Sequence, residues 1–161
     1  LEVMANGSLN YTVKGICIGM KVTWNYTPPT NGGDTFTSIK KGSKATLKIV
    51  QDEKNGFVKE LYIQKEPDID NRTFEAQLQK TVEQLQITYP FLSVKNKKNG
   101  TYLIDIPQEK RLGHEEHFSK VAKAFLHYVH NQDMPEWENE NTLAKYYITT
   151  TAVEMAKKGN K

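Results

Sequence analysis

TFTSIKKGSKATLKIVQDEKNGFVKELYI, residues 35–63, is the stretch of sequence that decides the fold. It contains three segments rich in β-branched and aromatic residues, which predict strands at 35–39, 44–50 and 57–63. Two short glycine-containing connections typical of hairpins separate them, at 41–43 and 53–56. Apolar and polar residues alternate in the middle segment, which predicts a buried face carrying Ala45, Leu47 and Ile49. An antiparallel sheet is therefore expected.

The residues before this stretch also favour strands. We expect strands at 10–14 and 16–26, with a turn or bulge at Gly15. Alternation at the end of the second strand predicts one shared face for Val22, Trp24 and Tyr26. A loop follows at 28–34, because its two prolines lack backbone donors and its two glycines permit positive φ.

Beyond residue 63 the period of the apolar residues changes from that of a strand to that of a helix. Asp70 or Asn71 is expected to cap a helix whose apolar positions are Phe74, Leu78, Val82 and Leu85. A hairpin follows at 91–94 and 101–106, around a charged tip at 95–100. Two further helices are expected at 114–130 and 141–157. Their predicted inward residues are Phe118, Val121, Ala122, Phe125 and Val129, and then Ala144, Ile148, Ala152 and Met155.

Strands followed by helices predict an α+β fold, an open, mainly antiparallel sheet with helices packed on one face. The 161 residues suit a single domain, 1–161. The one cysteine, Cys17, lies in an apolar run and is interpreted as a small buried hydrophobic residue. The apolar runs are too short to span a membrane, and both a cytoplasmic and an exported location stay open.

Charge and motifs argue against several classes of function. A net charge of +3 is too small to imply a nucleic-acid partner, although Lys40 and Lys41 with nearby aromatic residues could form a single-strand face. No glycine-rich nucleotide loop and no serine-nucleophile elbow occur. His114 and His117 stand three residues apart and lack an identified third ligand, so a solvated helix start is favoured over a metal site.

Three segments resemble a known family by their order and spacing. They are residues 6–26, residues 33–45, and Gly113–Phe118 with Met134–Glu138 and Asn141–Tyr147. Together they look like the C-terminal domain of a bacterial branch of the glucose–fructose oxidoreductase / inositol dehydrogenase family. The resemblance implies an N-terminal Rossmann domain that binds NAD or NADP and lies upstream of residue 1. It also implies hydride transfer from a sugar or polyol, with association into a homo-oligomer through the sheet face.

The catalytic groups of this family are not matched in the chain. In the family they are a lysine in a Glu-Lys-Pro segment and a helix with an Asp-x-x-x-His pattern. This chain has Lys65-Glu66-Pro67 instead, in which the first two residues of the Glu-Lys-Pro segment are exchanged. We therefore expect a substrate and oligomerisation domain that is inactive alone, with no catalytic, cofactor or metal site of its own. An aromatic ring for stacking and polar groups for hydroxyls make Trp24, Asp34, Thr35 and His114 the candidate substrate contacts.

Two other classes of function compete with this interpretation. A free-standing carbohydrate- or protein-binding module would be a compact monomer with a self-contained pocket. A metal hydrolase centred on His114 and His117 would retain metal after dialysis and lose it on His117→Ala.

Overall fold

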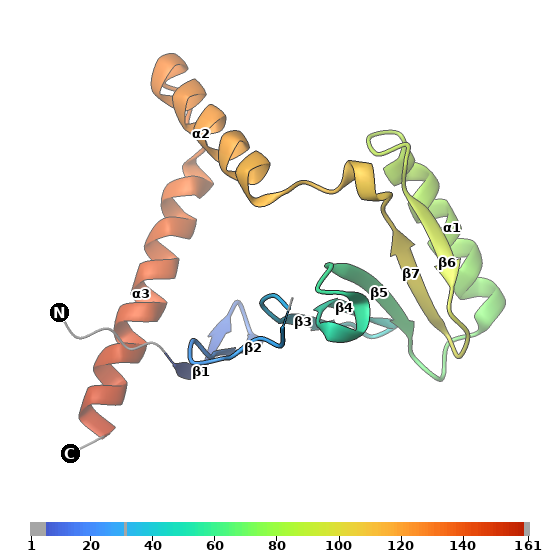
Figure 1. The fold of residues 1–161 in the computed structure, drawn as a ribbon, viewed down its shortest axis with the longest axis horizontal. Coiled ribbons are helices and arrows are strands. Elements are labelled where there is room, and N and C mark those ends of the chain that lie inside the picture. Colours follow the sequence, from blue (N-terminus) through green and yellow to red (C-terminus); the bar gives the residue numbers. More distant parts are fainter. Residues whose placement is uncertain (1–5, 31, 160–161) are drawn as a thin grey trace. The chain divides into compact units, whose positions relative to one another are not determined.

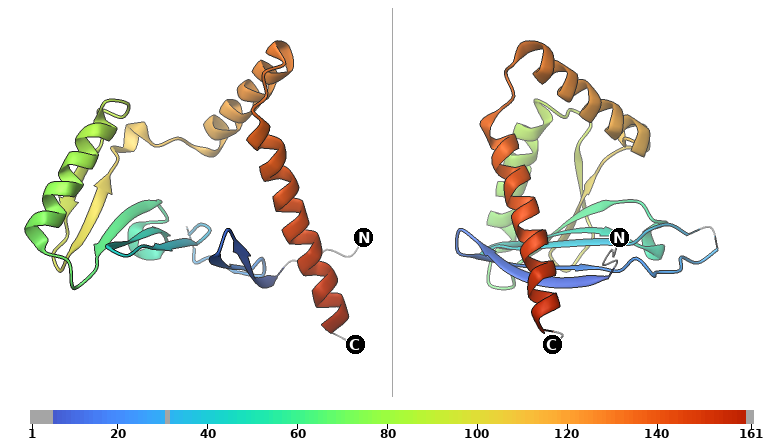
Figure 2. Two further views of the ribbon diagram at one scale, coloured as in Figure 1. Left: turned by 180° about the vertical axis from the view of Figure 1, so that it is seen from behind. Right: turned by 90° about the vertical axis from the view of Figure 1, so that its left-hand side faces the viewer.

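The computed structural model describes residues 6–30 and 32–159, and the chain forms two compact units (Figures 1 and 2). The first unit joins Leu1–Thr27 to Glu115–Lys161, and the second is Pro28–His114. That residues 1–161 form a single functional domain stays a prediction.

A β-hairpin opens the first unit. Strands β1 (Gly7–Val13) and β2 (Ile16–Val22) are antiparallel, and Val13 pairs with Ile16. Between them Lys14 and Gly15 have φ of 48° and 79°, the two left-handed residues of a tight hairpin turn. The turn predicted at Gly15 is confirmed.

Two sequence predictions about this hairpin are wrong. Strand β2 ends at Val22, where it pairs with Gly7, so Trp24 and Tyr26 lie beyond the strand. Cys17 is exposed rather than buried, because this sheet has only two strands and both carry largely exposed side chains.

Two long helices follow, α2 (His114–Asn131) and α3 (Glu136–Gly159), and from Glu115 onward both belong to the first unit. Helix α2 lies where it was predicted, whereas α3 begins before the predicted Asn141, directly after Pro135. The prediction that the apolar residues of α2 point into a core is wrong for the described residues. Its large residues are 60–70% exposed, namely Phe118, Val121, Phe125 and Val129. On α3, Met155 is likewise 67% exposed.

The second unit is built on a five-stranded antiparallel sheet of order β3-β4-β5-β7-β6. Its strands are β3 (Phe36–Lys41), β4 (Ala45–Gln51), β5 (Glu60–Lys65), β6 (Ser93–Asn96) and β7 (Thr101–Asp105). Short 3-10 turns follow β4 and β7, at Glu53–Asn55 and Gln108–Lys110. The predicted antiparallel hairpins are confirmed.

Helix α1 (Asn71–Gln86) packs on one face of this sheet, beside β6 and β7 in Figure 1. The predicted Asp70 cap is confirmed, since its carboxylate accepts the Thr73 N–H at 2.8 Å. Val82 of α1 is 3% exposed and Tyr102 of β7 is 4% exposed. The ring of Tyr102 lies 5.7 Å from that of Phe74. The core lies here, and the α+β fold with an open sheet and helical packing on one face is confirmed.

On β4 the predicted burial is wrong at two positions, since Leu47 was predicted to be buried and Thr46 to be exposed. Leu47 is 39% exposed, whereas Thr46 is 8% exposed. The Thr46 hydroxyl donates to Oε1 of Glu66 at 2.9 Å, and the Glu66 N–H donates to the Lys44 carbonyl. The connection from β5 to α1 therefore covers Thr46.

Candidate functional site

The predicted substrate contacts are divided between the two units. Trp24 belongs to the first unit, where its side chain is exposed and its backbone N–H donates to Oδ1 of Asn6 at 2.7 Å. Asp34 and Thr35 are exposed residues directly before β3 in the second unit, and the Asp34 carbonyl accepts Nε2 of Gln51 at 2.8 Å. His114 is the first residue of α2. The four therefore form no site within one unit, and their role stays a prediction.

The histidines that suggested a metal centre have no third ligand among the described residues. Residues 6–30 and 32–159 contain no group of three or more His, Cys, Asp or Glu side chains that could hold a metal ion. Nor do any of the helices in these ranges combine the length and apolar character needed to cross a membrane.

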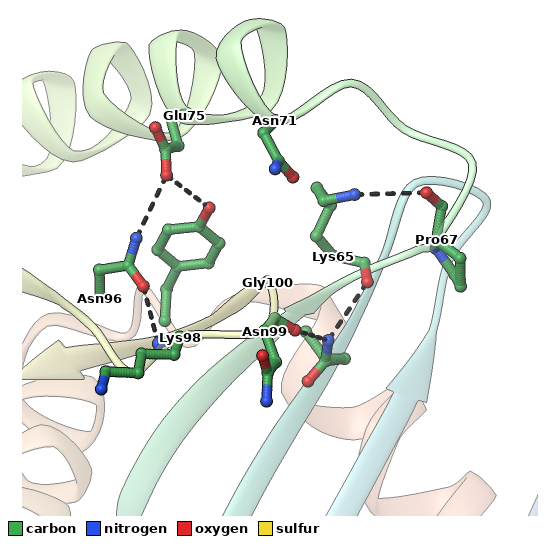
Figure 3. Close-up of a pocket in the computed structure, with 10 residues that line it drawn as sticks. Lys65, Pro67, Asn71, Glu75, Asn96, Lys98, Asn99 and Gly100 are labelled. Atoms are coloured by element: carbon green, nitrogen blue, oxygen red, sulfur yellow. Dashed lines mark hydrogen bonds between the residues drawn. The ribbon is translucent and has the colours of Figure 1, made fainter.

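The second unit contains an open hollow of about 720 Å³ between the start of α1 and the tip of the β6–β7 hairpin (Figure 3). We call it the polar hollow. It is lined by Gln64, Lys65, Pro67, Asn71, Glu75, Asn96, Lys98, Asn99, Gly100 and Tyr102. None of the four predicted substrate contacts lines it.

A buried lysine builds one wall of the polar hollow. Lys65 is 9% exposed, and its ammonium donates to three backbone carbonyls, those of Glu66, Pro67 and Ile69. An ammonium has three donors, so this set satisfies the charge without a carboxylate partner. Lys65 thereby holds the connection from β5 to α1 in place.

A carboxylate on α1 joins the opposite wall to the sheet. Oε1 of Glu75 accepts the Tyr102 hydroxyl at 2.9 Å and Nδ2 of Asn96 at 3.2 Å, as Figure 3 shows. Burial raises the pKa of the Tyr102 hydroxyl, and the hydrogen bond and negative charge of Glu75 raise it further. The phenol therefore stays a donor, and it fixes Glu75 at the rim.

The hairpin tip consists of three consecutive residues with left-handed backbone. Lys98, Asn99 and Gly100 have φ of 75°, 49° and 70°. Oδ1 of Asn96 accepts the Lys98 N–H at 2.8 Å, and Nε2 of Gln64 donates to the Asn99 carbonyl at 3.1 Å. The Gly100 carbonyl accepts the Lys65 N–H at 2.8 Å. Hydrogen bonds to two neighbouring segments thus hold the tip.

The sequence reasoning missed the polar hollow, although it identified parts of it. The sequence pattern predicts residues 95–100 only as a charged hairpin tip. The residues of the hollow come from positions 64 to 102, so sheet pairing is needed to bring them together. The available signal was the run Asn96-Lys97-Lys98-Asn99-Gly100, which combines turn residues with side chains that bind polar groups.

Comparisons with known proteins agree on one family. The model described as putative oxidoreductase C-terminal domain matches residues 1–157. A crystal structure of a putative oxidoreductase from Parabacteroides merdae is 39% identical, with a TM-score of 0.90 over 94% of this chain. This chain spans only 35% of that protein's length. A search of curated proteins found no match. The chain belongs to the putative oxidoreductase C-terminal domain family.

Proposed function

We propose that this chain is the substrate-side and oligomerisation domain of a nicotinamide-dependent sugar or polyol oxidoreductase, and that it is inactive alone. The observation that carries the proposal is the apolar surface of the first unit. Monomeric soluble proteins rarely expose large contiguous apolar patches, and such patches usually mark an interface.

This apolar surface follows the helical repeat. On α2 the exposed apolar residues recur every three or four positions at Phe118, Val121, Phe125 and Val129. On α3, Leu143 and Tyr147 are 70% and 72% exposed. A helix gains most of its stability in proteins from packing such a face. We infer that another part of a longer oxidoreductase covers these faces, since the chain spans 35% of the matched protein.

We assign cofactor binding to that other part. The resemblance to the glucose–fructose oxidoreductase / inositol dehydrogenase family supports a Rossmann domain that binds NAD or NADP. The same resemblance supports the assignment of hydride transfer and its proton-handling groups to that domain. The family of this chain is compatible with a nucleotide cofactor in the complete protein.

Trp24, Asp34, Thr35 and His114 are the proposed substrate contacts. The Trp24 side chain is 75% exposed, so its ring is available to stack on the apolar face of a sugar. Asp34 and Thr35 are exposed and offer hydroxyl-binding groups. We propose that these residues meet the substrate only when the cofactor domain is present.

Association is proposed to use the sheet face opposite α1. Strand alternation places Ile39 on that face, since Ile39 pairs with Lys48, which pairs with Tyr62 and then with Leu103. Ile39 is 52% exposed. Sedimentation of the longer protein with Ile39→Asp should show dissociation, and unchanged assembly would contradict this part of the proposal.

The test of the main proposal compares this chain with a longer protein that includes a cofactor domain. NAD(P) binding and dehydrogenase activity are measured for both with a panel of sugars and polyols. The longer protein should bind cofactor and oxidise a panel member, and this chain should do neither. In the longer protein Trp24→Ala should raise KM with little loss of kcat, whereas Trp137→Ala on α3 serves as the matched control. Cofactor binding by this chain alone would overturn the proposal.

A further inference from the structure

We propose that the polar hollow binds a neutral, polyhydroxylated small molecule such as a saccharide. The hollow lies entirely within the second unit, so this inference does not depend on the cofactor domain proposed above.

The chemistry of the lining carries the inference. Four residues with side-chain amides line the hollow, namely Gln64, Asn71, Asn96 and Asn99, and each amide offers both a donor and an acceptor. A hydroxyl group is also both a donor and an acceptor, so amides match it in either direction. The Gln64 amide is already bonded to Asn99 and Thr101, and the Asn96 amide to Glu75 and Lys98. No hydrogen bond joins the side chain of Asn71 or Asn99 to another of the described residues.

The charges in the hollow favour a neutral ligand over an ionic one. Glu75 supplies one carboxylate, and the exposed Lys98 supplies one ammonium. The ammonium of the third charged residue, Lys65, already donates its hydrogen bonds to backbone carbonyls. The Glu75 carboxylate would repel a phosphate or carboxylate ligand, and the Lys98 ammonium would repel a cation. The ring of Tyr102 is 4% exposed, so no aromatic surface is offered to a flat apolar ligand.

The backbone of the tip supports a role for its side chains. A positive φ is costly for residues other than glycine, yet Lys98 and Asn99 both adopt it. Glycine would relieve this strain, whereas Lys98 and Asn99 place polar side chains at the rim of the hollow. The hydrogen bonds from Gln64 and Asn96 hold the tip before any ligand arrives, which lowers the ordering cost of binding. The volume of about 720 Å³ lies in the range of small-molecule sites.

The test is a titration of the whole isotope-labelled chain with glucose, myo-inositol and maltose, followed by amide chemical shifts. We expect saturable shifts at Asn71, Asn99 and Gly100 with at least one probe. Lys98→Gly and Asn99→Gly keep the left-handed backbone and remove one polar side chain each. Each should weaken the Kd about three- to tenfold, the value of one hydrogen bond. Lys14→Gly is the matched control, because Lys14 also has a positive φ but lies in the hairpin of the first unit.

Three outcomes would overturn the proposal. The first is the absence of saturable shifts with all three probes. The second is an equal Kd for Lys98→Gly and Lys14→Gly. The third is tight binding of inorganic phosphate that Glu75→Gln strengthens, which would make the hollow an anion site. The spectrum of each variant without ligand reports its folding. Because the readout needs no cofactor, a negative result here leaves the proposed oxidoreductase function standing.

Discussion

The hydroxyl of Tyr102 on β7 donates a 2.9 Å hydrogen bond to Oε1 of Glu75 on α1. Beside it the rings of Tyr102 and Phe74 lie 5.7 Å apart, so one side chain joins the helix to the sheet by both packing and a polar contact. Burial and the Glu75 carboxylate raise the pKa of this hydroxyl. The contact therefore depends on the neutral phenol.

Tyr102→Phe keeps the ring and removes this contact. The free energy of unfolding should fall by about 1.5 kcal/mol, the low end for a hydrogen bond to a charged group, because Glu75 is exposed. Because the folded pKa is raised above 10.0, the contribution is complete below pH 10 and is lost as the pH rises further. Urea unfolding at neutral pH measures the change. Tyr89→Phe, at a tyrosine that is 48% exposed, should leave stability unchanged.

Tyr62 should ionise late in an alkaline titration. Its hydroxyl donates to Oε2 of Glu60, and this hydrogen bond, then burial and the charges of Glu60 and Asp52, raise its pKa to about 12. Absorbance of the phenolate during an alkaline titration should show a late phase that Tyr62→Phe removes. Glu60→Gln should move that phase to lower pH. The stability that Tyr62 contributes should be lost between pH 10 and about 12. A late phase that persists in Tyr62→Phe would contradict the assignment.

The sequence predicted those features that depend on residues adjacent in the chain. The Lys14-Gly15 turn and the Asp70 cap each depend on a few adjacent residues, so their chemistry is visible in the sequence. The burial of Thr46 depends on Glu66, which is twenty positions away, and no period in the sequence reveals such a partner.

The same limit applies to α2 and to the polar hollow. The apolar repeat through Phe118 and Phe125 predicts that a helix has an apolar face, but it does not say what covers that face. The hollow depends on β5–β7 pairing, which brings Gln64 opposite Thr101. Its lining is amide-rich, and isolated asparagines carry no motif that would single them out.

Asp70 should make α1 sensitive to acid. The Thr73 N–H hydrogen bond lowers the pKa of Asp70 from 3.8, so the ionised cap is favoured in the folded state. This contribution is present above the unfolded value of 3.8 and is lost as the pH falls through the folded pKa. Asp70→Ala should therefore destabilise the protein at pH 7 and have a smaller effect at pH 2. Asp68→Ala is the matched control, and equal effects of the two substitutions would contradict this role.

Lys65 should contribute to stability through its three carbonyl partners. Lys65→Met keeps a similar length and removes the donors, which leaves the carbonyls of Glu66 and Ile69 without their charged partner. We expect a loss of about 1.5–3 kcal/mol in urea unfolding, the range for hydrogen bonds to a charged group. Lys48→Met, at an exposed lysine of the neighbouring strand, should change stability little. A similar loss from both variants would mean that the carbonyl contacts are not the cause.

The apolar face of α2 should respond differently in this chain and in a longer oxidoreductase. Phe125 is 62% exposed here, so Phe125→Ala should change the unfolding free energy of this chain by no more than about 0.5 kcal/mol. If a further domain covers α2, the same substitution in the longer protein removes a buried ring and should cost about 3–5 kcal/mol. Lys123→Ala on the same helix is the control and should be nearly neutral in both proteins. Thermal or urea unfolding of the four variants measures the difference. Equal effects of Phe125→Ala in the two proteins would mean that this face of α2 stays uncovered and that no further domain packs on it.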